Sequence, residues 1–114
     1  MINGFEKETA ELNDYEKDTL LPLMVAGLTP RIGVERAITN LQMREGLKSL
    51  DYNISDARIR KLINHIRVNR LVVNLISSSK GYYRTNDLEE VNNYVESLMQ
   101  RASSIEEVAK SFRY

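Results

Sequence analysis

Serine, lysine and glycine occur together in residues 76–84, which read ISSSKGYYR. Side chains of these types can contact phosphate, because hydroxyls and amides donate hydrogen bonds and lysine supplies positive charge. A P-loop is excluded, since its lysine follows the glycine and begins a helix, whereas Lys80 precedes Gly81 and a strand pattern follows. The remaining interpretations are the tip of a β-hairpin and a finger that reaches toward nucleic acid.

Positive charge is concentrated in the middle of the chain. The 114 residues have a formal net charge of zero, but residues 57–86 contain seven Lys or Arg and no Asp or Glu. Residues 1–20 hold two Lys against six acidic residues, and residues 87–114 hold three Lys or Arg against six. This asymmetry favours a polyanionic partner for the basic segment, the alternative being a solvated helix face.

The sequence offers little evidence for metal binding, catalysis or a membrane span. His65 is the single histidine and there is no cysteine, so no metal-ligand spacing and no disulfide framework is present. Serines 77–79 lack a nucleophile elbow. The longest apolar run, LLPLMVAGL, is far shorter than the roughly 20 residues that span a bilayer. We expect no enzymatic activity, metal, cofactor, small-molecule substrate or membrane span, and a cytoplasmic location.

The elements that position the basic residues begin with two expected helices. Residues 1–13 form an acidic arm, after which Asp14 caps a helix that runs to about Leu28 and is kinked or started at Pro22. Residues 29–37 are a connection, and Ile38 and Thr39 add a very short strand. A second helix over 40–50 is capped by Thr39 or Asn40. It places Leu41, Leu47 and Leu50 at helical spacing, and Gly46 offers close packing against another helix.

The basic helix is expected over 56–70. Ile54 and Ser55 form the start signal, a hydrophobic residue followed by an N-cap. One apolar stripe faces inward, formed by Ile59, Leu62, Ile63 and Ile66. The opposite side is basic and amide-bearing, so this helix can present cations to a partner.

A β-hairpin and a long helix complete the chain. Residues 71–77 and 81–85 are rich in strand formers, and Gly81 supplies a positive φ at the turn. Thr85 or Asn86 then caps a helix that opens with acidic residues. Apolar residues recur at gaps of three and four from Leu88 to Phe112, which is a heptad seam.

The seam is longer than one small domain requires. One interpretation is a helix that continues outward and pairs with a second copy, through Leu98, Ala102, Ile105, Ala109 and Phe112. The other is that a separate last helix, capped by Ser103 or Ser104, folds back on the domain. The residues leave both open.

The stretch ISDARIRKLINHIRVNRLVVNLISSSKGYYRTNDLEEVNNYVESLMQR resembles small winged-helix proteins of bacteriophages and prophages. These share an IRKxIN-type helix, an SSxGYY-type wing and a following acidic helix. The resemblance covers about 38–101 and implies a mainly α fold with a small β-hairpin (α+β), a winged helix-turn-helix. It implies a domain over 14–101, with 102–114 as a helical extension.

In the resembling DNA-binding families, the second helix of the motif enters the major groove and the wing touches the backbone. Carried onto this chain, the groove helix is 56–70 and the wing 76–84, and the partner is double-stranded DNA. Candidates for base-edge contact are Arg60, Lys61 and Asn64, with Ala57 permitting close approach. Candidates for phosphate contact are Ser55, Arg58, Arg67, Ser78, Ser79 and Lys80, and His65 could join either set. For Arg58 and Arg67 the alternative is a salt bridge to the acidic terminal segments.

The resulting hypothesis is a phage or prophage factor for transcription regulation or DNA replication in a bacterial host cell. A homodimer follows from the first of the two interpretations of the C-terminal seam. The main alternative is a winged-helix adaptor that binds another protein and does not read DNA. RNA binding ranks third, because Tyr82 and Tyr83 face opposite sides of a strand and only one can stack on a base.

Overall fold

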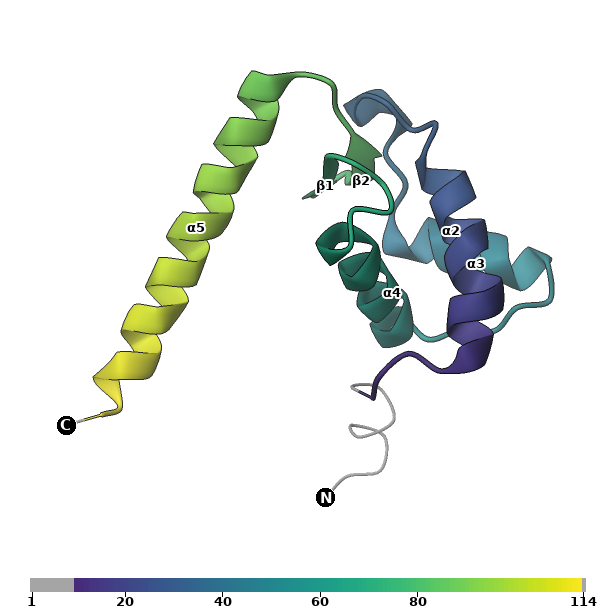
Figure 1. Ribbon diagram of the computed structural model, residues 1–114, viewed down its shortest axis with the longest axis horizontal. Helices are drawn as coiled ribbons and strands as arrows, with labels where there is room; N and C mark the ends of the chain where they lie inside the picture. The colour runs from purple at the N-terminus through teal and green to yellow at the C-terminus, as the bar shows by residue number, and fades with distance from the viewer. Residues whose placement is uncertain (1–9, 114) are drawn as a thin grey trace.

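Helices form most of this chain, and a single antiparallel hairpin separates the last helix from the others (Figure 1). The computed structural model describes residues 10–113. The bounds are η1, a π-helix (Glu16–Leu20), α2 (Leu21–Leu28), η2, a 3₁₀ turn (Val34–Arg36), α3 (Asn40–Ser49), α4 (Asp56–Val68), β1 (Leu75–Ser78), β2 (Gly81–Arg84) and α5 (Leu88–Ser111). The predicted mainly helical α+β fold is confirmed, and its shape is compatible with a winged helix.

The first helical segment is capped by Asn13, so the prediction of Asp14 as the cap was wrong by one residue. Asn13 Oδ1 accepts from the Glu16 N–H at 2.8 Å, and Glu16 Oε1 accepts from the Asn13 N–H at 3.0 Å. This reciprocal pair satisfies two amides that have no partner inside the helix.

Pro22 lies at the junction between the π-helix and α2, at the start of the α-helical segment. Just before it, the Leu21 N–H donates to the Glu16 carbonyl, five residues back. Proline lacks an N–H and its ring crowds the carbonyl four residues earlier, so a wider turn here accommodates it without ending the helix.

Helix α3 begins with a capping box between Thr39 and Gln42, as predicted for Thr39. The expected role of Gly46 in close packing was wrong, because a Cβ built there meets nothing within 4 Å. Only Met43 and Leu47 are buried from this helix, and Leu41 and Leu50 are exposed. The buried stripe of α3 therefore contains fewer apolar residues than the helical spacing of the sequence predicted.

Helix α4 supplies the centre of the core. The Ser55 hydroxyl accepts from the Arg58 N–H at 3.2 Å, which confirms the predicted cap. The predicted inward stripe is buried and packs with side chains of α2, α3 and the hairpin; it consists of Ile59, Leu62, Ile63 and Ile66. Each such side chain stabilises the fold by about 1.5–3 kcal/mol relative to exposure, which fixes the orientation of α4.

The hairpin has a two-residue tip, because Ser78 pairs with Gly81. Gly81 has a φ of 120°, as predicted, and a Cβ there would lie 2.5 Å from the carbonyl group of Ile38. Ile76 and Tyr83 pair across the strands and are both buried, whereas Tyr82 lies on the other face and is half-buried. The expectation that one of the two tyrosines is core is confirmed.

The first strand begins at Leu75, so residues 71–74 are turn and not strand as predicted. Arg70 and Asn74 have φ values of 54° and 58°. The Asn74 side chain donates to the Thr85 carbonyl at 3.2 Å. Asparagine tolerates the left-handed conformation, so Asn74 turns the chain into the hairpin and shortens the strand.

Residues 29–38 also pair with β2. Ile38 forms an antiparallel bridge to Tyr82, which confirms the very short strand predicted there, and Ile32 forms a parallel bridge to Arg84. Residues 34–36 form a 3₁₀ turn between the two bridges. Strand β2 thus has hydrogen-bonded neighbours on both sides, and the hairpin is held against α3.

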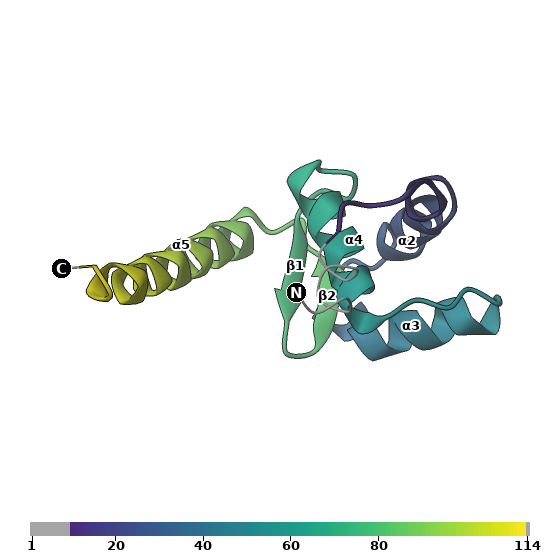
Figure 2. The ribbon, with the colours of Figure 1, turned by 90° about the horizontal axis from the view of Figure 1, so that it is seen from below.

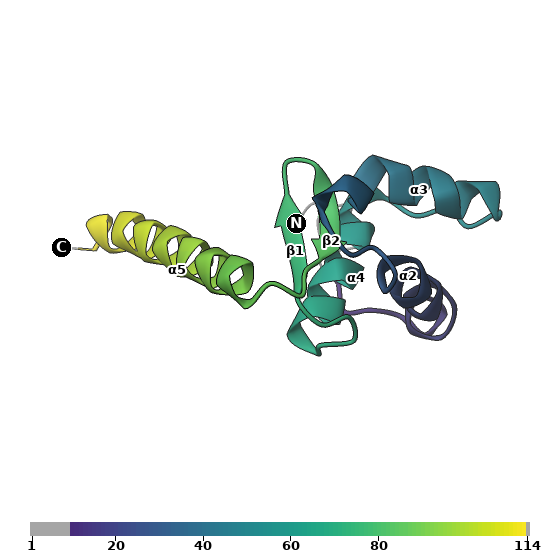
Figure 3. The same ribbon diagram turned by 90° about the horizontal axis from the view of Figure 1, so that it is seen from above.

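Helix α5 is one continuous helix of 24 residues, and it passes positions 101 to 104 without a break. Asp87 caps it by accepting from the Glu89 and Glu90 amides, so the predicted caps Thr85 and Asn86 were wrong. It leads away from the helices and hairpin (Figures 1, 2 and 3), and none of its residues is buried.

Candidate nucleic-acid interface

The outward face of α4 is polar and open. Arg60 and Asn64 are exposed, and Ala57 and Lys61 are half-buried beside them. These residues lie opposite the buried stripe, because positions three and four apart share a helix face. The structure thus brings together the four residues that the sequence nominated for base-edge contact.

Several cations near this face have no partner of their own. Within residues 10–113, no side-chain hydrogen bond or ion pair engages Arg60, Lys61, Arg70 or Lys80. Their charges are therefore free to neutralise an anion. Arg84 differs, because its guanidinium donates to the Val73 and Thr29 carbonyls and holds the hairpin in place.

Tyr82 links the hairpin to α4. Burial raises the pKa of Tyr82, and the nearby Arg60 and Arg67 act in the opposite direction and lower that pKa. The Tyr82 hydroxyl also lies 3.5 Å from Asn40 Oδ1 at the start of α3. The hairpin, the cations of α4 and the N-terminus of α3 are thus neighbours, a juxtaposition that sequence reasoning missed because it joins residues far apart in the chain.

The tip of the hairpin exposes Ser79 and Lys80 to solvent. Ser78 is used differently, because its hydroxyl donates to the Gly81 carbonyl and accepts from the Lys80 N–H. Ser78 therefore closes the turn, whereas the side chains of Ser79 and Lys80 are available for a phosphate.

Arg58 is engaged inside the fold. Its guanidinium binds both carboxylate oxygens of Glu16, at 2.6 and 2.9 Å, and donates to the Ala10 and Glu11 carbonyls. The side chains of Arg58 and Glu16 are only 12% and 5% exposed. The salt bridge to the acidic N-terminal segment, named above as the alternative to a phosphate contact, is present.

Arg67 is held by α5. Its Nη2 donates to the Tyr94 hydroxyl at 2.6 Å, and its guanidinium carbon lies 5.5 Å from the centroid of the same ring. The partner is a tyrosine and not the acidic residue that the sequence indicated. A cation over an aromatic face is stabilised by the ring's electrons, so Arg67 fixes the first half of α5 against α4.

The two remaining candidates, Ser55 and His65, lie at the start of α4 and on its side away from Arg60. Ser55 is exposed at the start of α4, with its hydroxyl accepting the capping hydrogen bond. His65 is half-buried on the side of α4 away from Arg60.

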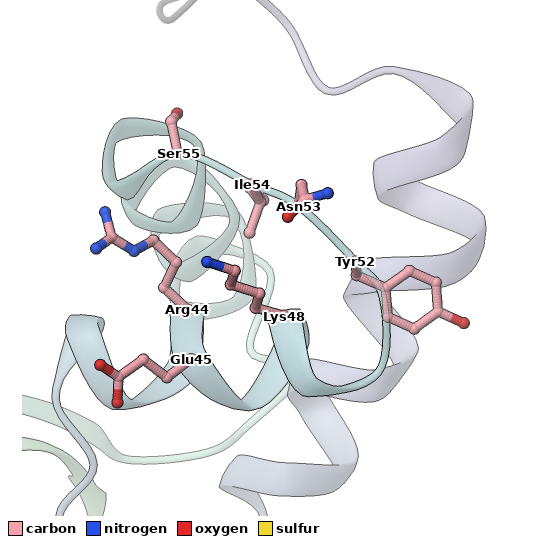
Figure 4. A pocket seen from close by; sticks show the side chains of 7 residues that line it. All are labelled: Arg44, Glu45, Lys48, Tyr52, Asn53, Ile54 and Ser55. Carbon is pink, nitrogen blue, oxygen red and sulfur yellow. The ribbon is translucent and has the colours of Figure 1, made fainter.

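A pocket of about 470 Å³ lies between α3 and the segment that leads into α4 (Figure 4). Arg44 and Lys48 extend from α3 toward that segment, as Figure 4 shows. Arg44 also pairs with Asp56 at 3.3 Å, across two half-exposed side chains. Neither cation was nominated from the sequence, because α3 has mixed charge and only the fold places these two beside the start of α4.

Residues 10–113 contain neither a metal-binding cluster nor a membrane-spanning helix. No group of three or more His, Cys, Asp or Glu is arranged to hold a metal ion in this part of the chain. Nor is any helix there both long and apolar enough to cross a membrane.

Comparison with known proteins returned no match: no protein-family model, curated protein or solved structure resembles this chain closely enough to assign it. The geometry of α4, the hairpin and α5 is therefore the basis on which we infer a function.

Proposed function

We propose that this protein is a winged helix-turn-helix protein that binds duplex DNA. In this proposal α3 and α4 are the two helices of the motif, α4 enters the major groove, and the β1–β2 hairpin is the wing. An α-helix fits the major groove of B-DNA, where Arg and Lys recognise guanine and Asn recognises adenine.

One observation supports the proposal most strongly. Within residues 10–113 no ion pair engages Arg60, Lys61 or Lys80. Tyr82, on the hairpin that bears Lys80, packs against the core to which α4 contributes its buried stripe. An interior structural role would give such cations partners within the fold, as it does for Arg58, Arg67 and Arg84. Unpaired cations on one helix and an adjacent hairpin are instead available to neutralise the phosphates of a duplex.

The proposal gives the residues different tasks. Arg60, Lys61 and Asn64 contact base edges beside Ala57, while Ser79 and Lys80 contact the backbone. Arg44 and Lys48 are new candidates for backbone contact. Arg58, Arg67 and Ser78 are assigned to the fold, because their polar atoms are already bound there.

Fluorescence anisotropy with a random-sequence duplex at several salt concentrations tests the proposal. Binding should weaken with salt, with a log–log slope of about −0.9 for each phosphate contacted. The triple variant Arg60→Ala, Lys61→Ala, Lys80→Ala should lose most of the affinity. The matched control removes three cations at the C-terminal end of the chain, two from α5 and one just after it, as Arg101→Ala, Lys110→Ala, Arg113→Ala. Absence of binding at low salt, or equal losses in the two variants, would contradict the proposal.

Helix α5 favours a second function, binding to another protein chain. Its apolar seam is exposed, with Ile105 70% and Phe112 78% accessible. Exposed apolar stripes of this length are typical of association surfaces. We infer self-association through Leu98, Ala102, Ile105, Ala109 and Phe112, which would place two α4 helices on a twofold DNA site. The adaptor interpretation predicts instead that α5 binds a different protein.

Sedimentation equilibrium separates these two roles of α5. Wild type should self-associate, and Ile105→Glu with Phe112→Glu should abolish association while leaving the helical circular dichroism unchanged. A monomeric wild type would contradict self-association, and a monomer that also fails to bind DNA would favour the adaptor interpretation. The resemblance to phage and prophage proteins supports a task in transcription regulation or DNA replication in a bacterial cytoplasm.

A further inference from the structure

Helix α5 contacts the rest of the protein over a short stretch near its start. Of its 24 residues, Glu90, Val91 and Tyr94 are half-buried, and all the others are exposed. Farther along, α5 leads away from α4 (Figures 2 and 3), and a cleft of about 690 Å³ lies between Val68 and Leu98. Because no side chain of α5 belongs to the core, this helix can be displaced while the core stays folded.

The contact consists of hydrogen bonds to two tyrosine hydroxyls. The Tyr94 hydroxyl accepts from Arg67 Nη2 at 2.6 Å and from the Ser77 N–H at 3.3 Å. The Tyr83 hydroxyl donates to Glu90 Oε2 at 2.9 Å. A single hydroxyl of α5 thus binds both the helix that we propose to read DNA and the first strand of the proposed wing.

Arg67 belongs to the side of α4 that we propose to face DNA. Arg60, Asn64 and Arg67 are four and three positions apart, so they lie along one side of the helix. Arg60 and Asn64 are exposed, whereas Arg67 is half-buried against Tyr94. Helix α5 therefore covers the C-terminal end of the proposed contact surface.

The segment that covers this end carries the same sign of charge as DNA. Residues 85–100 contain four acidic residues and no Lys or Arg. Like charges repel, so a DNA backbone is disfavoured beside Arg67 while this segment occupies that place. A phosphate oxygen is also a stronger acceptor for a guanidinium than a phenol oxygen, because the phosphate is charged. DNA and the first half of α5 therefore compete for the same arginine.

We propose that α5 is an autoinhibitory element, in which Tyr94 holds Arg67 away from DNA and the acidic residues of 85–100 repel the phosphates. When DNA binds, α5 leaves the contact and Arg67 exchanges the Tyr94 hydroxyl for a phosphate oxygen. Arg67 thus belongs to the fold in the free protein and to the interface in the complex. This regulation rests on the DNA binding proposed above and deepens it, because the measured affinity is reduced by the fraction of chains with α5 in contact.

Fluorescence anisotropy with a random-sequence duplex tests the autoinhibition. Tyr94→Phe keeps the ring and removes the hydroxyl, so it should lower the dissociation constant about tenfold by raising the binding-competent fraction. The matched control, Tyr15→Phe, changes an exposed tyrosine before the π-helix and should leave the affinity unchanged. Unchanged or weaker binding by Tyr94→Phe, or an equal gain in the control, would overturn the autoinhibition while wild-type binding stands. No binding by either protein at low salt would contradict the DNA proposal itself.

A double variant tests the role of the released arginine. Arg67→Ala added to Tyr94→Phe should cancel the gain in affinity, because the cation that α5 releases is then missing. A double variant that binds as tightly as Tyr94→Phe alone would show that Arg67 does not contact phosphate.

Two acidic residues of α5 separate the contact from the total charge of the chain. Glu90→Ala removes the acceptor of the Tyr83 hydrogen bond and should also strengthen DNA binding severalfold. Glu107→Ala removes the same charge from the exposed second half of α5 and should change the affinity much less. Equal gains in the two variants would assign the effect to net charge and overturn the role of the contact.

Spin labels measure the displacement of α5 directly, because the chain contains no cysteine. Leu50→Cys on α3 and Gln100→Cys on α5 place the labels at exposed positions. Labelled protein is diluted with unlabelled chains to remove distances between copies. Addition of duplex should change the distance distribution, and Tyr94→Phe should change it without DNA. An unchanged distribution with duplex bound would overturn the displacement.

Discussion

Arg58 of α4 and Glu16 of the π-helix form a bidentate ion pair, with Nη2 2.6 Å from Oε1 and Nε 2.9 Å from Oε2. Both side chains are nearly inaccessible. The pair joins the first helical segment to the helix that we propose to read DNA. Its effect is on the position of α4 and not on binding, because the guanidinium is fully engaged within the protein.

Removing one partner of this ion pair should destabilise the fold strongly. Arg58→Ala leaves the Glu16 carboxylate buried without its cation, which costs about 3–5 kcal/mol. The matched control, Arg60→Ala, removes an exposed arginine two positions away and should change stability by less than about 0.5 kcal/mol. Urea denaturation with constant m-values measures both, and similar losses in the two variants would contradict the assignment.

The same pair predicts a pH dependence. The hydrogen bonds from Arg58 lower the pKa of Glu16 in the folded state, against the opposing effect of burial. The carboxylate therefore stabilises the fold fully above its unfolded pKa of about 4.5. That contribution is lost as pH falls through the lower, folded pKa.

Comparison of wild type with Glu16→Gln isolates this effect. The difference in unfolding free energy should be constant from pH 6 to 8 and should shrink below about pH 4.5, as protonation makes the two side chains alike. Chemical denaturation at each pH measures it. A difference that grows as the pH falls would have the wrong sign and would rule out a lowered pKa.

Two glycines should respond in opposite directions to the same substitution. Gly46→Ala should stabilise the fold by about 0.5–1 kcal/mol, because position 46 is inside α3 and a Cβ there meets nothing within 4 Å. Gly81→Ala should destabilise it by more than about 1 kcal/mol, because φ is 120° and the Cβ would meet Ile38. Thermal unfolding ranks the two variants, and a stabilising Gly81→Ala would show that the hairpin tip is placed incorrectly.

Asn64 and Lys80 should affect DNA binding differently. Lys80→Ala should weaken binding to all sequences similarly and reduce the salt slope by about 0.9, because it removes one phosphate contact. Asn64→Ala should relax preference at one base pair by about 1–3 kcal/mol, because an amide reads adenine. Selection from a random DNA pool supplies the sites and anisotropy the affinities. If both folded variants behave like wild type, the proposed docking face is wrong.

Local patterns in the sequence were sufficient for most elements. The buried stripe of α4, the Ser55 cap and the glycine at the hairpin turn all follow from interactions between residues within a few positions of each other. The errors also have local causes. Several residues near 13 and 86 were able to cap a helix, and the apolar residues 71–73, two of them β-branched, were read as strand where Asn74 makes a turn.

Only the tertiary structure distinguishes the cations that are available to a partner from those that hold the fold together. From the sequence, five of the seven basic residues in 57–86 were candidates for DNA contact, with a salt bridge as the alternative for two of them. The five were Arg58, Arg60, Lys61, Arg67 and Lys80, and the alternative applied to Arg58 and Arg67. The structure binds Arg58 to Glu16, Arg67 to Tyr94 and Arg84 to two carbonyls, and it leaves Arg60, Lys61, Arg70 and Lys80 without such partners within residues 10–113.

The sequence alone determined the element types, the inward face of α4 and the seam of α5, because helical periodicity and capping depend on near neighbours. Only the tertiary structure decided which cations are engaged, that Tyr82 joins the hairpin to α4, and that α5 extends away and borders an open cleft. These features depend on contacts between residues distant in the chain, such as Glu16 with Arg58, 42 positions apart. Sequence spacing does not predict the distance between such residues, because that distance depends on how the core packs the elements together.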